Sequence, residues 1–163
     1  MKVLSKLTLI AFVVAAFFTT EISAQQMKTF TWTMYKTKFQ VPSDFKIQKN
    51  DKTEFTAGTD DIVLTIYPRK GEELDSDLMP ADLKSWALEN ELKNLGRVTN
   101  LDETVLNGYW GVFQEGTLDD SPVIVMLIVD PDFTDIGFYI WINYTEGQED
   151  LAIKILESFT PTE

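Results

Sequence analysis

Acidic residues are the first side chains in this sequence whose spacing suggests chemistry. Asp130, Asp132 and Asp135 follow a strongly apolar run, and carboxylate oxygens are the ligands that Ca²⁺ prefers. Asp130 and Asp132 fit the first and third positions of an EF-hand loop. The sixth position is Asp135 instead of glycine and the twelfth is Trp141 instead of glutamate, so an EF-hand is excluded. The alternatives are a looser Ca²⁺ site and a solvated turn. The turn is favoured, because Asp and Pro commonly occupy turns.

A second acidic segment lies before the first predicted helix and raises the same two alternatives. Its carboxylates are Glu72, Glu73, Asp75 and Asp77. Ligand geometry cannot be read from spacing, so this segment is also interpreted as a solvated loop.

Residues for nucleophilic or acid–base catalysis are scarce. The chain has no histidine and no cysteine, which excludes Ser-His-Asp triads, Cys-His dyads and HExxH zinc sites. Ser43 and Lys46 fit the pattern S-x-x-K, but the companion SDN and KTG elements are missing, so Ser43 and Asp44 are interpreted as turn residues. We expect a protein that is not an enzyme and has no cofactor. A carboxylate-based hydrolase is the least favoured alternative.

Aromatic residues are the other candidates, for binding instead of catalysis. The candidate binding residues are Trp32, Tyr35, Trp110, Tyr139 and Trp141. Aromatic side chains are effective anchors at interfaces, but they are also common in cores. Tyr139 and Trp141 are informative because they lie opposite the clearly buried face of their strand. If the second helix covers them they are structural, and if it does not they mark a groove.

The N-terminal residues have the features of a signal peptide. Lys2 and Lys6 precede the apolar run Leu7–Phe18, and Ile22-Ser23-Ala24 is a small-residue cleavage site. The run is shorter than the ~20 residues that span a bilayer. We therefore expect a signal peptide over residues 1–24, cleavage near Ala24, and one domain over residues 25–163 without a transmembrane segment. The protein should be periplasmic or secreted.

Composition narrows the class of partner. The formal net charge is −12, which opposes binding to the phosphates of nucleic acids. Absence of cysteine also excludes a lipid-anchored lipoprotein and disulfide bonds. We expect a protein or a component of the cell envelope as the partner, and a small-ligand or Ca²⁺-binding protein is the alternative.

Hydrophobic periodicity predicts the elements that must position these residues. Alternating patterns predict short strands before residue 70, at 29–34, 39–42, 45–49, 53–57 and 61–69, as an antiparallel meander. Helical spacing predicts helices over 80–95 and 148–159. Asn107-Gly108 predicts a tight hairpin.

The two longest predicted strands, 123–129 and 136–144, decide the architecture. Three aspartates between them exclude a membrane span. The first strand is apolar on both faces, which requires that both faces of its sheet be covered. We therefore predict an α+β fold in which helices flank a central antiparallel sheet, as an α/β/α sandwich.

The order of these elements resembles the Mog1/PsbP-like superfamily, which includes the bacterial DcrB-like proteins. The segments that carry the resemblance are Phe39-Gln40-Val41-Pro42 leading to Phe45, the strand from Asp61 to Tyr67, the helix around Trp86, Gly108-Tyr109-Trp110 and Ile155-Leu156-Glu157-Ser158-Phe159. The resemblance covers nearly all of residues 25–163. It implies a domain without an active site that binds a partner or assists an envelope complex.

Overall fold

The computed structural model describes residues 25–69, 71–101 and 106–162. The predicted signal peptide lies outside these residues. Neither helix in the described part of the chain has the length and hydrophobicity that are needed to cross a membrane. The strands are β1 (Met27–Trp32), β2 (Thr37–Pro42), β3 (Lys46–Asn50), β4 (Phe55–Gly58), β5 (Ile62–Pro68), β6 (Thr99–Leu101), β7 (Trp110–Leu118), β8 (Ser121–Asp130), β9 (Phe133–Tyr144) and β10 (Thr160–Pro161). The helices are α1 (Met79–Glu89) and α2 (Glu149–Leu156), with 3₁₀ turns η1 (Thr33–Tyr35) and η2 (Ser76–Leu78).

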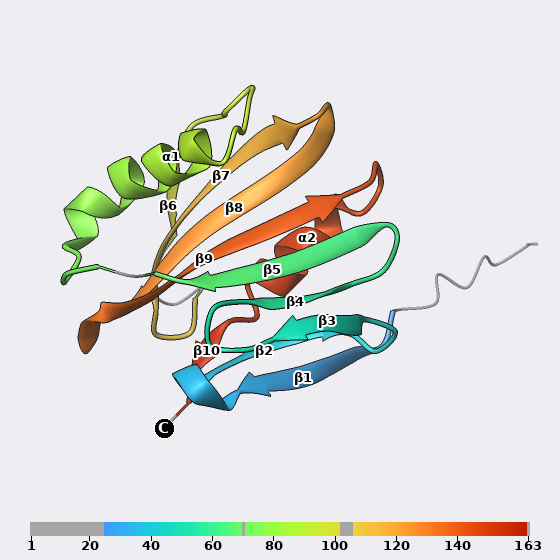
Figure 1. Cartoon of the computed structure of the whole chain (residues 1–163), viewed down its shortest axis with the longest axis horizontal. Coiled ribbons are helices and arrows are strands. Elements are labelled where there is room, and N and C mark those ends of the chain that lie inside the picture. Colours follow the sequence, from blue (N-terminus) through green and yellow to red (C-terminus); the bar gives the residue numbers. More distant parts are fainter. Residues whose placement is uncertain (1–24, 70, 102–105, 163) are drawn as a thin grey trace, which may run out of the picture.

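The strands form two sheets instead of the single meander that the N-terminal pattern predicts (Figure 1). The large sheet has the order β3-β4-β5-β9-β8-β7-β6, and the small sheet has the order β1-β2-β10. Every neighbouring pair in both sheets is antiparallel. The 3₁₀ turn η1 reverses the chain after β1, so β1 pairs with β2, whereas β3 begins the large sheet.

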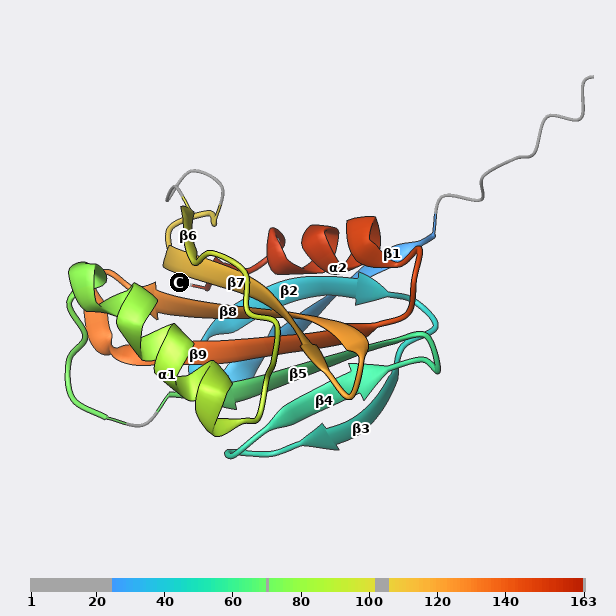
Figure 2. The ribbon, with the colours of Figure 1, turned by 90° about the horizontal axis from the view of Figure 1, so that it is seen from above.

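Strand β8 contributes to two hydrophobic cores, one on each face of the large sheet. Its even-numbered residues from Ile124 to Ile128 pack with α2 and the small sheet. Its odd-numbered residues from Val123 to Val129 pack with α1. Figure 2 shows the two helices on opposite sides of β8 and β9. The predicted sheet flanked by helices is therefore confirmed, and the two-sided apolar strand has the predicted cause.

Both helices are shorter than the periodicity predicts. Helix α1 ends at Glu89 instead of residue 95, because Glu91 adopts a left-handed backbone with φ of 64°. Leu92 is nevertheless buried against the core of α1, so the apolar spacing continues beyond the helix. Gly96, which follows the predicted helix range in the sequence, donates its N–H to the carbonyl of Glu115. Helix α2 ends at Leu156, and Phe159 is buried after the chain has left the helix.

The predicted hairpin at Asn107-Gly108 has the expected turn residues, but the segment before them includes residues 102–105, which lie outside the described residues. Both residues have positive φ, 56° and 108°. However, the strand that pairs with β7 in the described residues is β6, with Leu101 opposite Gly111. Asn107 has a further role, since its Nδ2 donates hydrogen bonds to the carbonyls of Glu157 and Phe159, each at 3.2 Å.

Candidate functional site

A groove of about 680 Å³ lies at the end of the molecule where the β8–β9 hairpin turns. It is formed by η1, this hairpin and the C-terminal strand β10, which Figure 1 places at the same end. The residues that line it are Met34, Tyr35, Lys36, Gly108, Asp130, Asp132, Phe133, Ile136, Pro161 and Thr162. We call it the hairpin-end groove. Its walls come from segments far apart in the sequence.

The hairpin-end groove gathers apolar side chains that are open to solvent. Met34 is 46% exposed, Phe133 59% and Ile136 38%. They make up three of the seven large exposed hydrophobic residues in the described part of the chain. Single exposed apolar residues are ordinary, whereas a cluster of them around a concave surface is typical of an interaction site.

The η1 wall is fixed by aromatic packing beneath it. The ring of Trp32 lies 4.6 Å from that of Tyr35, and the ring of Tyr35 meets that of Phe138 edge-on at 5.6 Å. Lys36 then takes a left-handed backbone with φ of 50°, and its carbonyl accepts a hydrogen bond from the N–H of Thr162 at 2.7 Å. This bond holds the C-terminal segment beside η1.

The hairpin wall owes its shape to Asp130. Its Oδ1 accepts a hydrogen bond from the N–H of Asp132 at 2.9 Å, an arrangement that short polar side chains favour in turns. The pairing register shifts at this point, and Asp130 lies opposite Phe133. The turn therefore presents Phe133 to solvent instead of to the core.

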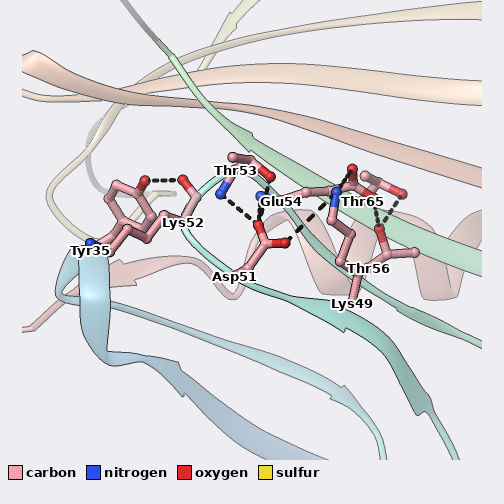
Figure 3. A network of polar contacts seen from close by, with 8 residues as sticks. All are labelled: Tyr35, Lys49, Asp51, Lys52, Thr53, Glu54, Thr56 and Thr65. Carbon is pink, nitrogen blue, oxygen red and sulfur yellow. Dashed lines mark hydrogen bonds and ion pairs between the residues drawn. The ribbon is translucent and has the colours of Figure 1, made fainter.

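A polar network in the β3–β4 turn supports Tyr35 from behind (Figure 3). The hydroxyl of Tyr35 donates to the carbonyl of Lys52. Asp51 Oδ1 closes the turn by accepting hydrogen bonds from the backbone N–H of Thr53 at 2.7 Å and from that of Glu54 at 3.1 Å. The Thr53 hydroxyl also donates to Asp51 Oδ1. This bond is the largest cause of the lowered pKa of Asp51, and the hydrogen bonds from the backbone lower it further. The turn is thus a stable support for the η1 wall.

The same network continues across the large sheet. Lys49 Nζ lies 2.9 Å from Glu54 Oε2, and the hydroxyl of Thr56 donates to Glu54 Oε1 at 2.6 Å. The hydrogen bond from Lys49 is the largest cause of the lowered pKa of Glu54. Thr56 also contacts the hydroxyl of Thr65 at 3.4 Å. These contacts tie β3 and β4 to β5.

The structure separates the five predicted aromatic residues. Tyr35 lines the hairpin-end groove. Trp32 is 1% exposed and belongs to the core, so it is not a surface anchor. Trp110, Tyr139 and Trp141 lie on the other face of the large sheet, against the core of α1.

Tyr139 and Trp141 are covered by helix α1. Trp86 of α1 stacks on Tyr139 with ring centres 4.4 Å apart and meets Trp141 edge-on at 5.8 Å. The indole N–H of Trp141 donates to Asn143 Oδ1. The first helix, instead of the second helix considered from the sequence, therefore covers these residues. They do not mark a groove, and they hold the layers of the fold together.

Of the predicted acidic residues, Asp130 and Asp132 line the hairpin-end groove, whereas Asp135 does not. Within the described residues, no group of three or more acidic side chains is placed to share a metal ion. The groove offers an apolar surface with two carboxylates and one lysine.

The three exposed apolar residues of the groove, Met34, Phe133 and Ile136, were not among the predicted site residues. Alternation of apolar residues places Met34 and Ile136 on the same faces as core residues. Met34 is exposed because it lies in η1, after β1 has ended. Ile136 is exposed because the pairing of β9 with β5 ends before it, at Phe138. Phe133 could have been recognised from the sequence, because it is a large apolar residue between the polar residues Asp132 and Thr134 of a predicted turn.

Tyr109, next to the groove residue Gly108, gives the fold a pH dependence. Burial, with a smaller contribution from the Asp130 carboxylate, raises the pKa of Tyr109 to about 12. The unfolded chain ionises this phenol near pH ~10. The stabilisation is complete below pH ~10 and is lost as pH rises towards 12, because only the unfolded state releases the proton in this window. The loss is up to about 1.4 kcal/mol per pH unit.

Urea denaturation between pH ~8 and pH ~11.5 tests this prediction. The free energy of unfolding of Tyr109→Phe should fall less steeply with pH than that of the wild type. The other tyrosines, present in both proteins, serve as the internal control. Equal slopes would show that Tyr109 does not hold its proton more tightly in the folded state.

Solved structures with similar folds provide a comparison. The cyanobacterial PsbP protein CyanoP from Synechocystis sp. PCC 6803 superposes with a TM-score of 0.62 at 11% identity, covering 86% of this chain and 95% of that one. The Ran-binding protein Mog1p of Saccharomyces cerevisiae superposes with a TM-score of 0.54 at 10% identity, covering 83% of this chain and 95% of that one. A protein from Bacteroides thetaiotaomicron gives a TM-score of 0.50 at 13% identity, covering 85% of this chain and 49% of that one. The sequence itself matches no family model and no curated protein.

Proposed function

From the Mog1/PsbP-like fold that this chain adopts, we propose that it is an exported, non-catalytic domain that binds a protein of the cell envelope through the hairpin-end groove. The observation that carries the proposal is the clustering of Met34, Phe133 and Ile136 around one concave surface. Fold alone does not determine function, so the groove supplies the specific argument. The yeast protein with this fold is a Ran-binding protein, which agrees with binding to a protein partner.

Export is the part of the proposal that depends on the N-terminal sequence. Lys2 and Lys6, the apolar run Leu7–Phe18 and the small residue Ala24 have the order of a signal peptide. A protein without cysteine is also suited to an oxidising compartment, because it has no thiol to oxidise. We propose that the mature protein begins near Gln25 and acts in the periplasm or outside the cell.

Site-specific photo-cross-linking in the producing cells tests the groove. A benzophenone amino acid is placed at Phe133 or Ile136 in the full chain, and at Leu88 as the matched control. Leu88 is 56% exposed but lies on α1, on the opposite face of the large sheet. We expect a protein adduct of one defined mass at Phe133 and Ile136, and none at Leu88.

A competing substitution makes the same experiment specific. With the cross-linker at Phe133, Ile136→Ser should reduce the yield of the adduct, since it removes an apolar contact without disturbing the core. Because Ile136 is partly exposed, its replacement should change the free energy of unfolding by about 0.5 kcal/mol or less. An equal yield of adduct from Leu88, or a yield at Phe133 that Ile136→Ser does not change, would count against the groove as the binding surface.

A further inference from the structure

We infer that the occupant of the hairpin-end groove is a cationic protein segment, in which apolar side chains are combined with lysine or arginine. This inference rests on the proposed function and adds the chemistry of the partner. It follows from the charges around the groove, since the apolar walls by themselves do not specify a partner.

Acidic residues lie both on the β8–β9 hairpin and beside it. Asp130 and Asp132 line the groove itself, and Asp135 is exposed near the start of β9. The segment that contains Glu72, Glu73, Asp75 and Asp77 runs beside it. Two backbone hydrogen bonds hold this segment there, from the N–H of Leu74 to the Thr134 carbonyl at 3.1 Å and from the N–H of Arg69 to the Gly137 carbonyl at 2.8 Å. All seven carboxylate residues have intermediate or high exposure.

The described cations near the groove do not neutralise these acids. Lys36 lines the groove, and Lys52 lies in the turn behind Tyr35. Arg69 is already engaged, because its Nε donates to Asp82 Oδ2 at 3.0 Å and its Nη1 to the carbonyl of Glu72 at 2.8 Å. With a net charge of −12 for the chain, the potential at this end favours the approach of a cationic partner.

The same charges argue against a lipid surface as the occupant. Exposed Met34, Phe133 and Ile136 could in principle enter a bilayer, but segments that bind membranes combine apolar residues with lysine or arginine, which are attracted to an anionic lipid surface. Seven carboxylates beside the apolar residues would be repelled by such a surface. A protein segment can satisfy both features at once, by placing apolar side chains in the groove and lysine or arginine against its rim.

Selection from a phage-displayed library of random peptides tests the inference. The immobilised full chain is the bait, and phage that also bind the Phe133→Ser/Ile136→Ser double variant are removed. We expect the remaining peptides to be enriched in apolar residues together with lysine or arginine. Replacing those basic residues by glutamate in a synthetic copy of a selected peptide should weaken binding by about tenfold or more.

Variants of the chain supply the second readout. Asp132→Asn should weaken binding of the selected peptide by about two- to fivefold at low salt, and the difference should shrink as salt is added. Leu88→Ser, on the opposite face, should leave the affinity unchanged. Urea denaturation of each variant confirms that binding is compared between folded proteins.

The outcomes separate this inference from the proposed function. Groove-dependent peptides without an excess of basic residues would overturn the inference and leave a protein-binding groove. Phosphatidylglycerol vesicles that bind the wild type but not the double variant would overturn it in favour of a lipid surface. An absence of groove-dependent peptides, with no specific photo-cross-link from Phe133, would overturn both.

Discussion

Phe39→Ala should lower the free energy of unfolding by about 4 kcal/mol, the largest effect that we expect from a single substitution. Phe39 is fully buried on β2 of the small sheet. Its ring lies 5.2 Å from that of Phe55 on β4 of the large sheet and is stacked 4.9 Å from that of Phe159, after α2. One side chain therefore joins both sheets and the C-terminal segment, and its removal leaves a cavity between them.

Phe133→Ala is the matched control for this prediction. It removes the same atoms from a side chain that is 59% exposed, so its effect should be about 0.5 kcal/mol or less. Urea denaturation of the two variants and the wild type measures the difference directly. Similar losses in both variants would show that the small sheet is not held by the aromatic cluster around Phe39.

Asp82→Ala should cost about 3 kcal/mol, because one carboxylate fastens α1 to the large sheet. Asp82 accepts hydrogen bonds from Arg69 Nε at 3.0 Å and from the Tyr139 hydroxyl. The side chains of Arg69 and Asp82 are only 12% and 23% exposed, so solvent weakens the pair less than it would at the surface. Alanine would leave the guanidinium with its bond to the carbonyl of Glu72 and the phenol without an acceptor.

Two variants resolve the contributions to this loss. Tyr139→Phe removes only the hydroxyl and should cost about 1 kcal/mol. Combining it with Asp82→Ala should add almost nothing to the loss from Asp82→Ala alone, since the two residues share one interaction. Additive losses in urea denaturation would indicate that Asp82 stabilises α1 only through its position in the first turn of the helix.

The sequence predicts the central layer of this fold well, for a reason visible in β8. Its residues alternate between two cores, and no arrangement other than a sheet covered on both faces buries them all. The resemblance to the Mog1/PsbP-like proteins is confirmed at the level of the fold. The separation into two sheets was not predicted, because it depends on η1, where Lys36 takes a left-handed backbone that has no signature in residue type.

The candidate site was harder to predict because its residues meet only in three dimensions. Tyr35, Asp130 and Asp132 were among the predicted site residues, but nothing in their local patterns relates η1 to the β8–β9 hairpin. Tyr139 and Trp141 had the stronger local signal, since they stand opposite a core face. Helix α1 covers them. The position of a helix over particular strands depends on the topology of the whole chain, so local patterns do not predict it.

The hairpin-end groove is assembled from η1, the β8–β9 hairpin and β10, which come from both ends and the middle of the folded domain. A chain that has lost its C-terminal strand would lack one wall of this groove. A partner that binds the groove would therefore bind the completely folded domain. By mass action, such a partner at a hundred times its dissociation constant would stabilise the native state by about 2.7 kcal/mol.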